Sequence, residues 1–313
     1  MSRKPFGDDD ETTVTGGQPL PSDEPSRVAE TTAAGEDEAP VEDFDAGDAP
    51  DAEAVVRRAL AAAALLRRLD LEQARAPLRD IEQLESWVDE NGLHASFGPT
   101  AFALFGAPPG EWTDEDADAV AWGAEELSML GWALGRTELP GLITRADVTD
   151  LLAALPRAGD LSPFVGSASL LDLAEVDAAR SLFSTLEEAA RIEAFARGIA
   201  TDPDVSIDDQ QLEDVFGAAA HEGFDRDAVT AEHGDRGAAV EVLRFWTKLL
   251  LEHLFADGGP FTAFRFTHDE LVALEDDALA LLLTLSQLRA ETLSWLLEGA
   301  PAEDDGEPPD QDG

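Results

Sequence analysis

The 313-residue sequence contains no cysteine and no tyrosine, and its only lysines are Lys4 and Lys248. Without cysteine, the chain cannot form disulfides, thiolate metal sites or iron–sulfur clusters, and it has no cysteine nucleophile. Without tyrosine, it has no phenolic group to act as an acid or a base. The composition therefore excludes thiol-based redox and covalent chemistry.

Positive charge is scarce as well, because 21 Lys and Arg residues face 67 Asp and Glu residues, for a formal net charge of −46 at pH 7. Exposed carboxylates repel one another over about 10 Å in 0.1 M salt but over only about 3 Å in 1 M salt. A compact chain tolerates this repulsion most easily in concentrated salt, so the composition predicts a cytoplasmic protein of a salt-accumulating halophile. The same charge disfavours nucleic acid and anionic lipid as partners.

No part of the sequence predicts a membrane span or an apolar signal segment. Residues 1–11 are polar and acidic. Residues 91–110 lack Asp, Glu, Lys and Arg, but their prolines and polar residues predict a loop and a short helix instead of a span. We therefore expect a protein that is not inserted in a membrane.

Composition divides the chain into three parts. Residues 1–50 and 301–313 are acidic, rich in Gly and Pro and poor in apolar residues, so we expect two disordered acidic tails. Residues 51–300 carry the apolar residues needed for a core, and they predict one folded domain.

The folded part predicts an all-α, bundle-like or orthogonal arrangement of helices, since no βαβ alternation is present. Helices are expected over residues 51–76, 78–90, 113–136, 145–155, 172–198, 206–221, 238–255 and 267–299. Their expected N-terminal caps are Thr113, Thr144, Asp172, Ser206 and Thr267. The only candidate strand is residues 261–266 (FTAFRF).

Residues 119–136 are apolar almost all round, yet they include Glu125 and Glu126. A carboxylate on a buried helix needs a partner or a proton. One interpretation is therefore a site carboxylate framed by indole rings, and the other is a structural ion pair or a cap to a neighbouring loop. The remaining residues of the candidate site are Trp122, Trp132 and Arg136.

Arginines gather on the first predicted helix. Arg57 and Arg68 are eleven residues apart, about three turns, and are flanked by Arg58 and Arg67. They predict either a basic strip for an anionic ligand or a solvated face that pairs with the chain's own carboxylates, and the second is favoured because acids are so abundant. Nucleic-acid binding through these four arginines is the least supported interpretation.

The five histidines do not have the spacing of a metal site, and Gly-rich phosphate loops and the nucleophile-elbow pattern are missing. We therefore predict neither a metal nor a cofactor.

The last predicted helix carries two apolar lines over residues 271–295. They consist of Leu271, Ala278, Leu285 and Thr292, and of Leu274, Leu281, Leu288 and Trp295. This heptad is typical of a coiled-coil-like homodimer or of a partner helix. Further leucines widen the apolar surface, so burial within the chain's own bundle is favoured.

Residues 55–141 resemble an uncharacterised family, domain of unknown function 4272. The resemblance rests on Arg57–Leu60, on Trp87 with Asn91-Gly92-Leu93, and on the pattern W-x-x-E-x-L-x-x-L-x-W-A-L-G that begins at Trp122 and ends at Gly135. The family commonly has an arginine directly after the first tryptophan, where this chain has Gly123. The resemblance implies no activity.

The sequence thus favours a non-enzymatic, helical interaction or scaffold domain. The alternative is a hydrolase-type enzyme that uses Glu125, Glu126 or a dispersed histidine as its general base.

Overall fold

The computed structural model describes residues 49–199, 216–255, 261, 264 and 266–299. These residues form helices and no strand, which confirms the all-α prediction. Of the two predicted acidic tails, residues 1–48 and 301–313 lie outside the described residues. None of the described helices is long and apolar enough to cross a membrane.

The N-terminal helices follow the predictions closely. They are α1 (Ala52–Gln73), α2 (Leu78–Glu90), the short 3-10 helix η2 (Leu93–Ser96) and α3 (Pro99–Phe105). The Asp51 side chain caps α1 by accepting from the Ala54 N–H at 2.8 Å. Gly92, which follows α2, has a φ of 61°, and this left-handed conformation suits glycine and ends the helix there.

The middle of the chain holds α4 (Asp114–Ala133), α5 (Val148–Ala153) and α6 (Ser162–Gly166). The capping box of Thr113 and Asp116 is present, as predicted. The predicted cap at Thr144 is wrong, because Asp147 caps α5 by accepting from the Thr149 N–H at 2.8 Å. The carbonyl of Thr144 is instead held by Arg289, so this residue belongs to a loop.

Two long helices follow, α7 (Leu173–Ala196) and α9 (Arg226–Leu254). Asp172 caps α7 as predicted. Helix α9 begins well before the predicted residue 238 and changes direction at Gly234, whose φ is 72°. The predicted cap at Ser206 lies outside the described residues.

The predicted helix over 267–299 is two helices, α10 (His268–Ala273) and α11 (Asp276–Glu298). Its Thr267 capping box is present. The break is at Leu274, which is extended (ψ 139°). Arg197 donates to the carbonyls of Val272 at 2.8 Å and Leu274 at 2.6 Å, and thereby replaces helical hydrogen bonds that a continuous helix would have made. Of the candidate strand, Phe261, Phe264 and Phe266 are described, and none lies in a strand.

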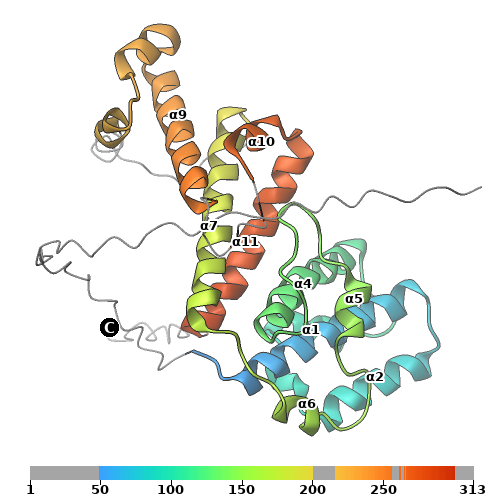
Figure 1. The fold of residues 1–313 in the computed structure, drawn as a ribbon. Coiled ribbons are helices and arrows are strands. Elements are labelled where there is room, and N and C mark those ends of the chain that lie inside the picture. Colours follow the sequence, from blue (N-terminus) through green and yellow to red (C-terminus); the bar gives the residue numbers. More distant parts are fainter. Residues whose placement is uncertain (1–48, 200–215, 256–260, 262–263, 265, 300–313) are drawn as a thin grey trace, which may run out of the picture. The chain divides into compact units, whose positions relative to one another are not determined.

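Two helix pairs carry most of the core. Helix α7 packs along α11 and α1 packs along α4, while α11 also contacts α4 (Figure 1). Leu285 and Thr292, from the first of the two predicted apolar lines, are buried in α11. Three further residues of α11 outside both lines are also buried, namely Leu282, Leu293 and Leu296. Much of the apolar surface of α11 is therefore used within the chain, and the homodimer stays a prediction.

Charged side chains join the helices inside this apolar core. Arg68 of α1 is fully buried, binds Glu72 at 2.8 Å and Glu85 at 3.0 Å, and donates to the carbonyl of Ala107 at 2.9 Å. Glu193 of α7 binds Arg197 at 2.8 Å and Arg244 of α9 at 3.0 Å. Arg68 and Glu193 thus each have a counter-charge, as a low-dielectric interior requires.

His268, at the start of α10, lies near the Glu193 cluster. Burial lowers the pKa of His268 below 6.5, Arg244 and Lys248 act in the same direction, and Glu193 and Asp269 oppose them. Its Nε2 atom is buried without a hydrogen-bond partner. The neutral ring is therefore the form that suits the folded state.

This shift predicts a pH dependence of stability. The unfolded chain protonates His268 near pH 6.5 and the folded chain only at lower pH, so this stabilising contribution is complete above pH 6.5 and is lost as the pH falls through the folded pKa. Between about pH 7.5 and about pH 5.5, wild type should lose more unfolding free energy than His268→Gln, as measured by urea titration at constant KCl. Parallel losses in the two proteins would contradict the prediction.

Candidate functional site

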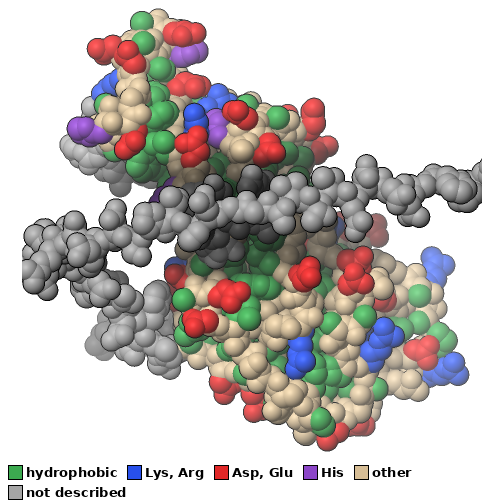
Figure 2. Space-filling view, in the orientation of Figure 1, with side chains coloured by type: hydrophobic (Ala, Val, Ile, Leu, Met, Phe, Trp, Pro, Cys, Tyr) green, Lys and Arg blue, Asp and Glu red, His purple; other side chains and the backbone are tan. Residues whose placement is uncertain are grey.

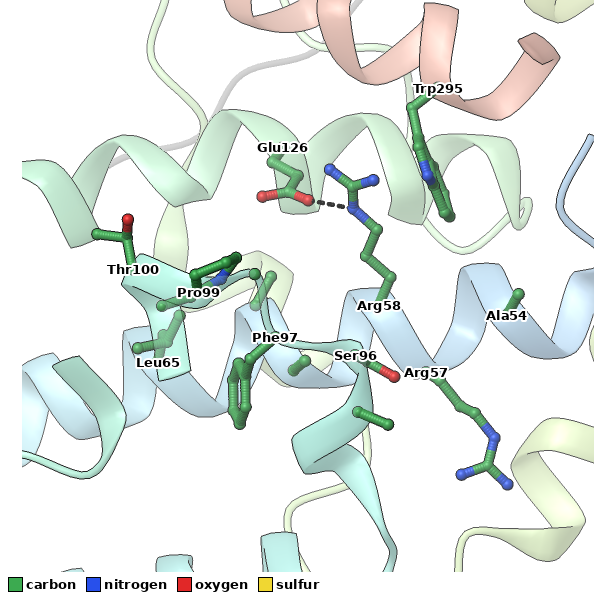
Figure 3. Close-up of a pocket in the computed structure, with 15 residues that line it drawn as sticks. Ala54, Arg57, Arg58, Leu65, Ser96, Phe97, Pro99, Thr100, Glu126 and Trp295 are labelled. Carbon is green, nitrogen blue, oxygen red and sulfur yellow. Dashed lines mark hydrogen bonds and ion pairs between the residues drawn. The ribbon is translucent and has the colours of Figure 1, made fainter. Parts of the chain in front are cut away.

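A groove of about 640 Å³ lies between α1, the η2–α3 segment and single side chains of α4 and α11 (Figure 3). Its floor is formed by α1, where small residues leave room above the helix. Its other side is the chain from Ala95 to Ala101. We call this hollow the Arg58 groove, and the α1 residues of its floor are Ala54, Arg57, Arg58, Ala61, Ala62 and Leu65.

Arg58 is held on two sides within the groove. Its Nε donates to Glu126 Oε1 of α4 at 2.6 Å, and its guanidinium carbon lies 4.0 Å from the centre of the Trp295 ring of α11. Guanidinium groups stack favourably on indole faces. No described residue accepts a hydrogen bond from its Nη1 or Nη2. Arg58 is thus a fixed guanidinium with donors left for another molecule.

Arg57 forms the end of the floor. It pairs with Glu53 at 2.8 Å, and its Nη1 donates to the carbonyl of Asn91 at 3.3 Å. This contact ties α1 to the end of α2, from which η2 and the groove wall follow. Arg57 and Arg58 point to different sides of the groove in Figure 3.

The wall of the groove is mostly apolar. Phe97 and Pro99 line it, and Pro99 occupies the first turn of α3, where a missing N–H costs no helical hydrogen bond. Phe102, on the same short helix, is 53% exposed. An exposed apolar ring therefore follows directly in the chain after Ala101, the last residue of the groove wall.

Arg58 and Glu126 also line a smaller hollow of about 280 Å³, together with Trp122, Gly123 and Leu288. The ring of Trp122 is covered by Arg145, whose guanidinium carbon is 4.2 Å from the ring centre. The structure therefore brings together Trp122, Glu126 and Arg58, from both ends of the family-like region.

Glu125 lines neither of these two hollows. It forms an ion pair with Arg289, and both side chains are 0% exposed. Its Oε2 accepts from Arg289 Nη2 at 2.7 Å, and its Oε1 accepts from the Ala146 N–H at 2.8 Å. Arg289 also donates to the carbonyls of Gly141 and Thr144, each at 2.9 Å. The pair therefore joins α4 and α11 to the loop before α5.

This geometry matches the interpretation of Glu125 as a structural ion pair that also caps a neighbouring loop. Burial lowers the pKa of Arg289, and the charge of Glu125 opposes that shift. The partner of Glu125, Arg289, comes from α11 and is 164 residues away along the chain.

The remaining predicted site residues are dispersed. Trp132 is buried in the core. Arg136 donates to Ser167 Oγ at 3.2 Å and stacks near Phe164. Arg68 is enclosed in its ion pairs, so it does not share a surface strip with Arg57. Sequence reasoning named Arg58 and Glu126 but missed Trp295 as their partner, since nothing local links these three positions.

Histidines contribute nothing to the Arg58 groove. His94 is nearest in sequence, and its Nε2 lies 2.5 Å from Asp89 Oδ1, beside the rings of Phe102 and Phe105. In the described ranges, no group of three or more His, Asp and Glu side chains could hold a metal ion.

Comparison with known proteins identifies one family. The family described as Domain of unknown function (DUF4272) matches residues 33–207, which is more than half of the chain and extends beyond the resemblance expected over 55–141. No curated protein and no solved structure matches the chain significantly. The chain therefore belongs to the family of domains of unknown function DUF4272.

Proposed function

We propose that this protein is a non-enzymatic interaction domain of a halophile's cytoplasm, and that the Arg58 groove binds a segment of a partner protein. The observation that carries the proposal is the guanidinium of Arg58, stacked on Trp295 and oriented by Glu126, with Nη donors that no described residue uses. Arginine and tryptophan are the residues in which interface binding energy concentrates.

The chemistry of the groove defines the partner segment. Apolar walls at Phe97 and Pro99 suit an apolar side chain, and the free donors of Arg58 suit a carboxylate. The exposed ring of Phe102, one residue along the chain from the groove wall, supports a partner that extends past the groove, as a peptide does. We therefore propose a peptide with an apolar residue next to an Asp or Glu.

The hydrolase alternative draws less support from the geometry. A general base must reach the proton that it removes. Both carboxylate oxygens of Glu125 are engaged, and the side chain is fully buried. Glu126 reaches the groove, but its Oε1 is held by Arg58 at 2.6 Å. No histidine lines the groove to replace them.

A peptide-display experiment tests the proposal. A random library of twelve-residue peptides is selected on the full chain in concentrated KCl, and the dissociation constants of selected peptides are measured for variants. Arg58→Gln should weaken binding by about tenfold or more, because a charge-assisted hydrogen bond is lost. Ala95→Trp, at an exposed position on the groove wall, should block the groove by its bulk.

Arg180→Gln is the matched control. Its side chain is 31% exposed against 32% for Arg58, and it also pairs with a carboxylate, but it does not line the Arg58 groove. Binding to Arg180→Gln should equal binding to wild type. Peptides that bind Arg58→Gln and Ala95→Trp as tightly as wild type, or a selection that yields no peptide, would refute the proposal.

A further inference from the structure

A second hollow, of about 400 Å³, lies between α1, α2 and α5 and is independent of the Arg58 groove. Its charged residues are Arg67, Asp70 and Arg157, Thr149 adds a hydroxyl group, and we call it the Arg67–Arg157 pocket. Its volume is within the range of pockets that hold small ligands, about 300–1,000 Å³. The four apolar residues of its wall are Leu71, Leu84, Val148 and Leu152.

Arg67 forms no ion pair with any described carboxylate, although the chain is rich in them. Its Nη2 donates only to the carbonyl of Leu155 at 3.3 Å and, at the limit of a hydrogen bond, to that of Leu152 at 3.5 Å. Its Nη1 is buried and has no hydrogen-bond partner. The other enclosed arginines, Arg68 and Arg289, each bind a carboxylate instead.

Arg157 increases the excess of positive charge. Within the described ranges, neither Arg67 nor Arg157 forms an ion pair. Burial and then the charge of Arg157 lower the pKa of Arg67 to about 10, so Arg67 stays protonated at neutral pH. Two guanidinium groups that line one partly buried site are unfavourable when no carboxylate pairs with either of them, and an anion between them relieves that repulsion.

Asp70 limits the charge of that anion. The three charged groups of the pocket, Arg67, Arg157 and Asp70, sum to a charge of +1 at neutral pH. A single negative charge balances this sum, whereas a doubly charged phosphate would exceed it and would approach Asp70. The leucine and valine wall adds room for a short branched apolar group.

We propose that the Arg67–Arg157 pocket binds a small organic monoanion, a carboxylate attached to a short branched apolar group, with the carboxylate between the two arginines. A free carboxylic acid and the C-terminal carboxylate of a peptide that ends in leucine share this chemistry. Either source places one charge beside Arg67 and Arg157 and an apolar group against Leu71, Leu84 and Val148.

Calorimetric titration of the full chain at one fixed KCl concentration tests the proposal. The probes are 3-methylbutanoate, acetyl-glycyl-leucine, the neutral 3-methylbutanamide and inorganic phosphate. At least one of the two carboxylates should bind, and the tighter of them identifies the source. The amide should bind about tenfold more weakly or not at all, because it offers no charge to the arginines. Binding of the amide or of phosphate as tight as that of the carboxylates, or no binding of either carboxylate, would overturn the proposal.

Charge reversal at an exposed position tests whether carboxylate binding depends on this pocket or only on the net charge of the chain. Arg157 is exposed, so Arg157→Glu should fold, which far-ultraviolet circular dichroism can verify. Its carboxylate would occupy the place of the ligand beside Arg67, and carboxylate binding should fall by at least about tenfold. Arg79→Glu changes the net charge equally at a side chain that is 77% exposed and outside the pocket, and it should bind like wild type. Equal binding by the two variants would refute the site.

Discussion

Replacing Arg289 with alanine is expected to lower the free energy of unfolding by about 3–5 kcal/mol, because Glu125 would stay buried without its counter-charge. The substitution also removes the donor to the carbonyls of Gly141 and Thr144, so the loop before α5 should loosen. Urea unfolding at constant KCl measures the change. Glu125→Gln should act in the same direction, since it leaves the charge of Arg289 uncompensated.

The control for this prediction is Arg79→Ala, at an exposed ion pair with Asp80. Exposed pairs contribute about 0–1 kcal/mol, so this variant should remain close to wild type. The double variant Glu125→Gln/Arg289→Ala removes both charges and should lose less stability than the sum of the single changes. Additive losses, or an Arg289→Ala variant as stable as Arg79→Ala, would show that the pair is not a structural centre of the fold.

Transfer from about 2 M to about 0.1 M KCl is expected to lower the midpoint of thermal unfolding by about 10 °C or more, or to abolish the cooperative transition. The reason is the net charge of −46, whose repulsion extends about three times farther in dilute salt than at 1 M. Figure 2 shows acidic side chains spread over the visible face, where screening acts on them directly. Circular dichroism during heating measures the transition.

Sucrose provides the control for the salt experiment. It strengthens apolar burial because it is excluded from the protein surface, but it does not screen charge. Sucrose at an osmolality equal to that of the concentrated KCl should therefore restore little of the midpoint in dilute buffer. Full restoration by sucrose, or an unchanged midpoint at about 0.1 M KCl, would contradict an electrostatic requirement for salt.

Local sequence signals located most helices because the forces behind them act over only a few residues. The capping boxes at Thr113 and Thr267 and the stop at Gly92 need no distant contact, and all three are present. The errors occurred where distant side chains intervene. Arg197 ends α10 by taking carbonyls that a longer helix would use, and Arg289 holds Thr144 in a loop.

For the candidate sites too, the sequence indicated local features but not the contacts between distant residues. The sequence shows that Glu125 lies on an apolar helix and therefore needs a partner. It does not identify that partner, because Arg289 is 164 residues away along the chain. The sequence named Arg58 and Glu126 individually. Their contacts with each other and with Trp295 form only because α11 packs beside α1 and α4. The sequence placed Arg67 only in a possible strip with Arg57, Arg58 and Arg68 and did not predict the Arg67–Arg157 pocket, because the lack of an ion pair depends on the tertiary surroundings.

The amino-acid sequence alone determined the helical class, most helix ends, the family and the acidic character of this protein, since each of these depends on composition or on neighbours within a turn or two. Only the tertiary structure decided which charges are enclosed, which carboxylate each arginine meets and where hollows remain. Those outcomes depend on side chains from separate helices that share a dry interior, where a charge must find a partner or remain available to a ligand.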